Sequence, residues 1–198
     1  MGNNKIKLQP GNVYHIYNRG INSCPIFTEP TNYEHFLGLY DKHISSVAET
    51  FAWVLMGNHF HLAVRILKPE MIDNEDDIMV EKRINQQFSN LFNAYTKAFN
   101  KKYRRTGSLF EHSFERKLIP DTNYLKKLIL YIHNNPVHHG FCSHPMEYPW
   151  SSYLSYVHPK KNDLQMKTAQ ACLDEETNFG PWLNEEVKVD EIEKWLKM

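Results

Sequence analysis

The alternation of apolar and polar residues predicts three β-strands in the first third of the chain. Val13–Arg19 alternates β-branched and aromatic residues with polar ones, which is typical of a strand. Thr50–Met56 and His59–Ile66 alternate in the same way and are separated only by Gly57 and Asn58. Two such residues between alternating segments favour a tight hairpin turn. We therefore expect one strand followed later by a β-hairpin.

Apolar residues at helical spacing predict one helix between the first strand and the hairpin and a longer helix after it. The first begins at Thr31, which forms a capping box with Glu34, and its apolar residues continue to Ile44. The second begins at Asp77 and is broken at Gly107. Both are amphipathic, so each is expected to pack one face on a sheet.

The segment after Gly107 predicts a fourth strand and a third helix. Ser108–Ile119 is rich in apolar and aromatic residues, as strands are. Asp121 or Thr122 then caps a helix with an apolar face, which consists of Leu125, Leu128, Ile129 and Ile132. We expect Pro136 to stop this helix, because the residue before a proline disfavours the helical region.

The predicted order is therefore β-α-β-β-α-β with one more helix. This order is typical of an α+β, ferredoxin-like fold, in which an antiparallel sheet carries two helices on one face. We expect the other face of the sheet to be open. A chain of 198 residues fits one such domain over residues 1–157, including the C-terminal helix that bears Tyr131, and an acidic, partly helical extension over residues 158–198.

Composition indicates a globular protein without a membrane span. Apolar residues make up 41% of the chain and aromatic residues 13%, which excludes a disordered protein. The sequence contains no apolar run of about 18 residues and no apolar segment of a secretory signal. We therefore expect a cytoplasmic protein with no membrane partner, whose 3 cysteines are reduced thiols.

The distribution of charge predicts a nucleic-acid partner although the net charge is zero. Residues 77–120 contain nine basic and four acidic side chains, whereas residues 163–198 contain four basic and nine acidic ones. A basic middle and an acidic end are the asymmetry expected of a nucleic-acid face with an acidic appendage. One hypothesis is that the acidic extension covers the basic segment and limits non-specific DNA binding.

His59 and His61 are candidate metal ligands. Residues i and i+2 of a strand point to the same face, so the two imidazoles converge, and the apolar Phe60 points the other way. The histidines should lie on the open face of the sheet. Two neutral imidazoles side by side form half of a divalent-metal site. The alternative is that both are surface histidines without a ligand.

Tyr131 and Asn135 form the second candidate pair, because residues four apart lie on one side of a helix. Lys127 lies one turn earlier on the same side, opposite the apolar face, so this pattern does not require Tyr131 in the core. A phenol has a pKa of about 10 and needs a base, a cation or a metal-polarised electrophile before it acts as a nucleophile. The alternative is an exposed or half-buried tyrosine without a catalytic role.

Four motifs between residues 12 and 156 resemble those of the single-tyrosine HUH transposases, in particular the transposases of insertion elements and the REP-associated tyrosine transposases. The motifs are WVLMGNHFHLAV, RRTGSLFEHSFERKLI, YLKKLILYIHNNPVHHG and YPWSSY, in this order. The resemblance implies that His59 and His61 are the HUH metal ligands, that Asn135 is a third polar ligand, and that Tyr131 is the nucleophile.

The resemblance also implies the reaction and its cofactor. Such an enzyme is a metal-dependent transposase or nickase that cleaves and rejoins single-stranded, hairpin or palindromic DNA through a covalent 5′-phosphotyrosine intermediate. The divalent ion is Mg²⁺ or Mn²⁺, and imidazole ligands suit Mn²⁺ at least as well as Mg²⁺. Members of the family work as homodimers that exchange the tyrosine helix or as monomers, and the sequence does not choose between them.

Contacts with DNA are expected from a basic stretch with interleaved aromatic residues. Cations there neutralise phosphates, and an aromatic ring stacks on unpaired bases. The residues expected to make these contacts are Lys102, Tyr103, Arg104, Arg105, Arg116 and Lys117. By contrast, Trp150 and Tyr153 are expected to pack the end of the domain onto its core.

Two other functions remain open from the sequence. A domesticated relative would recognise palindromic DNA without transposition, although the intact set of His59, His61, Tyr131 and Asn135 weighs against it. A histidine-based phosphodiesterase would act without a covalent intermediate. Enzymes of that class usually carry a pair of His-x-Thr/Ser motifs, whereas this chain has one His-x-His motif without a hydroxyl partner.

Overall fold

The computed structural model describes residues 6–71, 77–158, 192 and 194. In this part of the chain the strands are β1 (Val13–Arg19), β2 (Ala48–Leu55), β3 (His59–Ile66) and β4 (Glu115–Leu118). The α-helices are α1 (Pro30–Ile44), α2 (Asp77–Tyr103), α3 (Thr122–His138) and α4 (Tyr153–Val157). Short 3₁₀ turns are formed by Ile21–Ser23, Pro69–Met71 and Pro145–Glu147.

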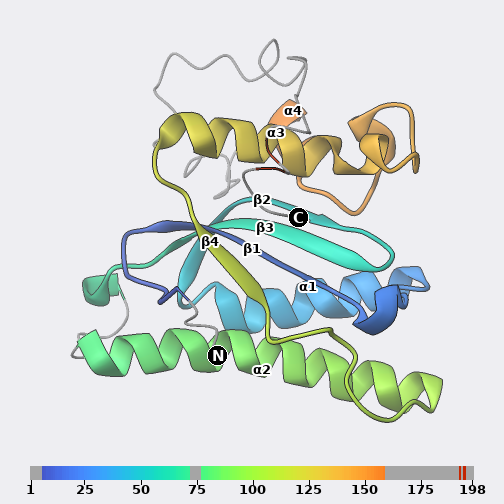
Figure 1. The fold of residues 1–198 in the computed structure, drawn as a ribbon, viewed down its shortest axis with the longest axis horizontal. Helices are drawn as coiled ribbons and strands as arrows, with labels where there is room; N and C mark the ends of the chain where they lie inside the picture. Colours follow the sequence, from blue (N-terminus) through green and yellow to red (C-terminus); the bar gives the residue numbers. More distant parts are fainter. Residues whose placement is uncertain (1–5, 72–76, 159–191, 193, 195–198) are drawn as a thin grey trace.

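The four strands form one antiparallel sheet in the order β2-β3-β1-β4. The order of elements along the chain is the predicted β-α-β-β-α-β pattern followed by α3. Figure 1 shows the sheet between two helical layers, with α1 and α2 on one face and α3 on the other. The α+β class and the antiparallel sheet predicted from the sequence are thus confirmed.

The face of the sheet toward α1 and α2 carries the larger core. Phe60 and Leu62 of β3 and Ile16 of β1 are at most 1% exposed and pack with Phe36 of α1 and Phe88 of α2. These strand residues alternate with the histidines of β1 and β3, as period-2 patterning requires. Burial of this apolar face is the main reason why the sheet and the two amphipathic helices associate.

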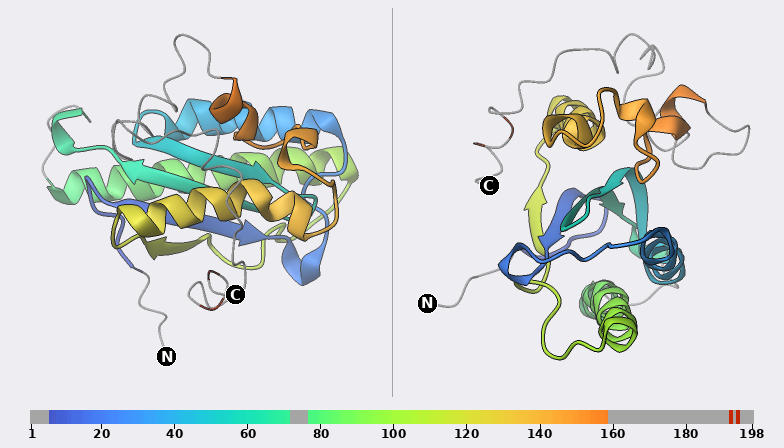
Figure 2. Two further views of the ribbon diagram at one scale, coloured as in Figure 1. Left: turned by 90° about the horizontal axis from the view of Figure 1, so that it is seen from above. Right: turned by 90° about the vertical axis from the view of Figure 1, so that its right-hand side faces the viewer.

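Helix α3 covers the second face of the sheet, so the prediction that this face is open is wrong (Figure 2). The predicted apolar face of α3 is confirmed, since all four of its residues are buried. It packs in a second core with Phe51, Ala52 and Val54 of β2. An apolar helix face has to be buried against another element, and β2 is buried on both of its faces.

Several element ends differ from the predicted ones. The first helix is capped by Glu29 together with Asn32, two residues before the expected box. The fourth strand is only 4 residues long, because the chain before Glu115 makes a single bridge, between Phe110 and Gly20. The long helix ends at Tyr103 rather than near Gly107.

Pro136 does not stop α3, which continues to His138. A proline lacks only its own N–H, and the turn beyond it is closed by other donors. His139 N–H donates to the carbonyl of Asn135 at 3.0 Å, and Phe141 N–H donates to that of Pro136 at 2.8 Å. At the other end Asp121 caps the helix by accepting a hydrogen bond from Tyr124 N–H.

The segment after α3 packs onto the edge of the sheet, as predicted for Trp150 and Tyr153. The carbonyl of Trp150 accepts a hydrogen bond of 2.9 Å from Leu55 N–H, and Ser151 forms a bridge with Val54. Tyr153 is 3% exposed. The acidic extension over residues 158–198, which is expected to be partly helical, lies outside the described residues apart from positions 158, 192 and 194. Among the described helices none has the length and apolar character needed to cross a bilayer.

Candidate active site

A pocket of about 320 Å³ lies between α3 and the ends of β1 and β3. Its lining residues come from the strands, from the loop before β4, and from α3 with the residue that caps its C-terminal end. The lining residues are Tyr17, Asn18, Arg19, His59, His61, Glu111, His112, Glu115, Tyr131 and His139. Three of the four residues expected to carry the chemistry therefore lie in one pocket, and the fourth, Asn135, contacts His59.

His59 and His61 lie on the same face of β3, with ring centroids 5.2 Å apart. Because α3 covers this face, the side chains are 9% and 1% exposed rather than open to solvent. Burial lowers the pKa of His59 to about 4, although the nearby Asn135 side-chain oxygen, which would accept a hydrogen bond from Nε2–H of the charged form, opposes the shift. Burial, and then the neighbouring His15 and His59, hold the pKa of His61 well below its ordinary value. Both imidazoles are therefore neutral near pH 7, as metal ligands must be.

The inner nitrogens of both imidazoles are occupied by partners. His59 Nδ1 lies 2.7 Å from Asn58 Oδ1, so it donates a hydrogen bond there. His61 Nδ1 lies 3.0 Å from Nε2 of a third buried histidine, His15. An imidazole that carries its proton on Nδ1 has a free lone pair on Nε2. The two Nε2 atoms are then the ones left to face the pocket.

The donor atoms near these Nε2 positions fit a divalent cation. Asn135 is 1% exposed, and its Oδ1 lies 3.2 Å from His59 Nε2. When His59 is protonated on Nδ1, this contact joins two lone pairs, which a cation between them would relieve. His61 Nε2 has no hydrogen-bond partner among the described residues, and neither has Asn135 Nδ2. Two imidazoles and an amide oxygen are ligands that Mn²⁺ accepts.

The described residues contain no group of three or more His, Cys, Asp and Glu side chains arranged to hold a metal ion. The candidate set instead combines two histidines with an amide. Such a set leaves open coordination positions, which a catalytic metal needs for its substrate.

Tyr131 lies beside this set, with its ring edge-on to His61 at a centroid distance of 5.4 Å. It is 1% exposed, so the prediction that the core does not need it is wrong. Helix α3 is buried on more than one side. Its aliphatic residues pack on β2, and Tyr131 packs over the ends of the strands. Lys127, one turn before Tyr131, lies over the ring of Tyr124, 5.8 Å from its centroid.

Sequence reasoning missed several pocket residues, of which His139 is the most instructive. Its ring is 5.2 Å from that of His59, edge to face. Tyr131, Asn135 and His139 are spaced by four, so one helical side carries all three. The signal was present, but the expected stop at Pro136 excluded His139 from the helix. Arg19, at the end of β1, also lines the pocket, and its charge is among the causes that lower the pKa of His59 and His61 after burial.

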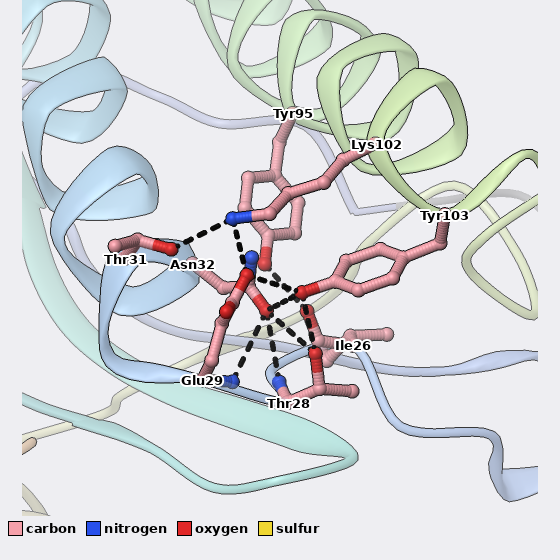
Figure 3. A network of polar contacts seen from close by, with 8 residues as sticks. All are labelled: Ile26, Thr28, Glu29, Thr31, Asn32, Tyr95, Lys102 and Tyr103. Carbon is pink, nitrogen blue, oxygen red and sulfur yellow. Dashed lines mark hydrogen bonds and ion pairs between the residues drawn. The ribbon is translucent and has the colours of Figure 1, made fainter.

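The predicted DNA contacts Lys102 and Tyr103 lie in a polar network on the other side of the sheet (Figure 3). The Lys102 ammonium pairs with the Glu29 carboxylate and donates to Thr31 Oγ1 at 2.9 Å. Tyr103 OH donates to Glu29 Oε1 at 2.7 Å and lies 3.0 Å from Asn32 Oδ1. The hydrogen bonds of Lys102 and then of Tyr103 lower the pKa of Glu29. The network joins the end of α2 to the start of α1.

Arg104 and Arg105, two further predicted DNA contacts, lie directly after the end of α2. Arg104 has a positive φ of 51°, which turns the chain out of α2. The Arg105 guanidinium lies over the ring of Phe99, 5.9 Å from its centroid. Residues 102–105 do not line the pocket, so any DNA that they bind lies beyond it.

Arg116 and Lys117 are neighbours on β4 and point to opposite faces of the sheet. Arg116 donates to Asn85 Oδ1 of α2 at 3.0 Å. Lys117 is directly opposite His15 of β1 in the antiparallel register, so both side chains lie on the face toward α3. The Lys117 charge is the second cause, after burial, that lowers the pKa of His15 to about 3. Of the six predicted DNA contacts, Lys117 is thus placed on the face of the sheet that carries His59 and His61.

Comparison with known proteins agrees with these motifs, although no family model matches the chain. The chain is 31% identical over 109 residues to a REP-associated tyrosine transposase of Haemophilus influenzae, and the match covers 53% of this chain and 58% of that relative. The solved structure of a REP-associated tyrosine transposase bound to a REP hairpin shares the fold with a TM-score of 0.54 and 18% identity, over 79% of this chain and 86% of that one. The chain is thus similar in sequence to one REP-associated tyrosine transposase, of which it spans 58% of the length, and similar in fold to another, in agreement with its four motifs.

Proposed function

We propose that this protein is a DNA strand-transfer enzyme that cleaves and rejoins single-stranded or hairpin DNA through Tyr131, with a divalent ion as cofactor. One observation carries the proposal: a buried tyrosine lies edge-on to a neutral histidine in a pocket that also contains a second histidine and an adjacent amide. A structural tyrosine would not need such neighbours. The relationship to the REP-associated tyrosine transposases supports the same reading.

His59, His61 and Asn135 would hold Mg²⁺ or Mn²⁺, which when bound supplies charge to neutralise the scissile phosphate. Tyr131 Oη forms a bond to phosphorus as the bond from phosphorus to the 3′ oxygen breaks. The 5′ end of the cut DNA stays on the protein as a phosphotyrosine ester, and the other end leaves as a 3′-hydroxyl. Attack of a 3′-hydroxyl on the same phosphorus reverses the step and rejoins a strand.

The substrate class follows from the charge around the pocket and from the relative. The structural neighbour is bound to a REP hairpin, and a hairpin or single strand is the substrate that we propose here. Arg19 at the pocket and Lys117 on the same face of the sheet would contact phosphates.

Incubation with labelled hairpin oligonucleotides tests the proposal. The oligonucleotides carry genomic palindromes from beside the gene and a label at either end, and Mg²⁺ or Mn²⁺ is added. We expect a metal-dependent covalent adduct with the 5′ end of the cleaved product, lost in Tyr131→Phe and in His61→Ala. Lys127→Gln is the control, because Lys127 lies on α3 but outside the pocket. Hairpin binding without any adduct would instead indicate a recognition protein without transposase activity.

A further inference from the structure

Behind the candidate metal ligands lies a third buried histidine that the proposed reaction does not use. His15 of β1 is 0% exposed, and its Nε2 is 3.0 Å from Nδ1 of His61. Its other nitrogen, Nδ1, is buried without a hydrogen-bond partner among the described residues. Among the described residues, the hydrogen bond of this imidazole is therefore the one to His61.

A histidine in this position is costly for folding alone. An unpartnered polar atom in a protein interior lowers the stability of the fold, whereas an apolar side chain of similar size would carry no such cost. Tyr14 and Ile16, which flank His15 in β1, fill the larger core on the other face of the sheet, so His15 is not part of that core. The position of His15 is thus better explained by what it does to His61 than by packing.

The tautomer of His61 is the property that this contact sets. His61 offers a lone pair on Nε2 only when its proton is on Nδ1, and a buried Nδ1–H needs an acceptor. His15 Nε2 is that acceptor when His15 carries its own proton on Nδ1. His59 has the same arrangement with Asn58 Oδ1 at 2.7 Å, so each candidate ligand has an acceptor on the side away from the pocket. Histidines that bind metals in proteins nearly always donate their second N–H in this way.

Aromatic neighbours hold the orientation of the pair. In the antiparallel register His61 is opposite Tyr17, and His15 is the diagonal neighbour two residues before Tyr17. The Tyr17 ring stacks on His15 at a centroid distance of 4.7 Å and on His61 at 6.1 Å. Tyr131 meets both imidazoles edge-on, at 6.5 and 5.4 Å. The two imidazoles therefore have little freedom to rotate.

We propose that His15 is a positioning residue that fixes His61 with its proton on Nδ1 and directs Nε2 at the divalent ion. The inference rests on the proposed metal site. It predicts that loss of the acceptor weakens the binding of Mn²⁺ about 10- to 100-fold, as is typical for residues that support a ligand from behind. His15 itself touches neither the ion nor the DNA.

The test measures the dissociation constant of Mn²⁺ directly, by electron paramagnetic resonance of the free ion, with no DNA present. His15→Phe keeps a ring but removes the acceptor, and His15→Gln places an amide oxygen near the position of Nε2. We expect the first variant to bind Mn²⁺ 10- to 100-fold more weakly and the second to recover most of the affinity. The matched control is His133→Gln, because His133 is also 0% exposed but contacts Ser152 outside the pocket.

Each outcome bears on one claim. If the wild-type protein does not bind Mn²⁺, the metal site and this inference both fail. Unchanged affinity in a folded His15→Phe variant would overturn the role of His15 and leave the metal site standing. Should His15→Phe not fold, ¹⁵N NMR of the wild-type imidazoles decides: a proton on His61 Nδ1 supports the inference, and a proton on Nε2 overturns it.

Discussion

Four buried histidines make the stability of the metal-free protein sensitive to mild acid. Burial, followed by the Lys117 charge, lowers the pKa of His15 to about 3, and burial alone lowers that of His133 to about 3. Burial lowers the pKa of His59 to about 4 and holds the pKa of His61 well below its ordinary value. Between these values and the ordinary pKa of 6.5, the folded protein keeps the four imidazoles neutral while the unfolded chain protonates them.

The size of the effect follows from proton linkage. Because the unfolded state binds more protons, the free energy of unfolding falls as pH falls. The contribution of each imidazole is complete above pH 6.5 and is lost progressively until the pH reaches its folded pKa. At about pH 5.5 each costs about 1.4 kcal/mol relative to about pH 7.5, so four cost about 5 kcal/mol. Domains of this size are stable by only about 5–15 kcal/mol, so the loss is large.

Urea unfolding, followed by tryptophan fluorescence in the presence of EDTA at the two pH values, measures this difference. The variant His133→Gln removes one of the four groups at a position outside the pocket. We expect its loss on acidification to be smaller than that of the wild type by about 1.4 kcal/mol. A wild-type loss of less than about 1.4 kcal/mol, or an identical loss in the variant, would refute the reasoning.

Three further predictions follow from single contacts. Lys117→Gln should weaken hairpin binding and reduce the salt dependence of log K by about 1, because Lys117 lies on the face of the sheet that carries the pocket. Lys102→Gln should change that slope less, because Lys102 lies at the end of α2 on the other side of the sheet, in an ion pair with Glu29. Fluorescence anisotropy across salt concentrations compares the two variants, and equal slopes would contradict the placement. Asp121→Ala should lower the free energy of unfolding by about 1 kcal/mol, because Asp121 caps α3 at Tyr124 N–H, and Asp121→Asn should restore most of it in urea titrations. Tyr131→Phe should leave hairpin affinity within about threefold of the wild type, since the ring stays in place and only one hydroxyl is lost. A larger change in the same anisotropy assay would show that Tyr131 contributes to binding as well as to cleavage.

The strands and the histidine pair could be predicted from the sequence because their patterns are local. Strand periodicity alone places His59 and His61 on one face and Phe60 on the other, and the structure agrees. Strand periodicity does not predict which element packs on the face that carries the two histidines. Helix α3 covers this face because its apolar residues pack on β2, which is far from α3 in the sequence. The burial that lowers the histidine pKa values could therefore not be predicted.

The remaining pocket residues depend on contacts that no short pattern records. His15 reaches His61 only through the register of β1 with β3, a separation of 46 residues. The spacing of four residues from Tyr131 through Asn135 would have included His139, but a proline normally ends a helix at the residue before it. The basic stretch at residues 102–105 was predicted from composition, and composition does not say which side of the sheet a helix end occupies. Its place at the end of α2, away from α3, follows from tertiary packing.

The central claim is that Tyr131 is the residue that becomes joined to DNA. The most direct test digests the covalent adduct formed with a 5′-labelled and a 3′-labelled palindromic hairpin in Mn²⁺, and identifies the modified peptide by mass spectrometry. We predict a nucleotide attached through its 5′ phosphate to the peptide that contains Tyr131. Attachment of the nucleotide to any other residue would contradict the account. So would a Tyr131→Phe variant that still cleaves the hairpin at the wild-type rate and leaves no protein on the products.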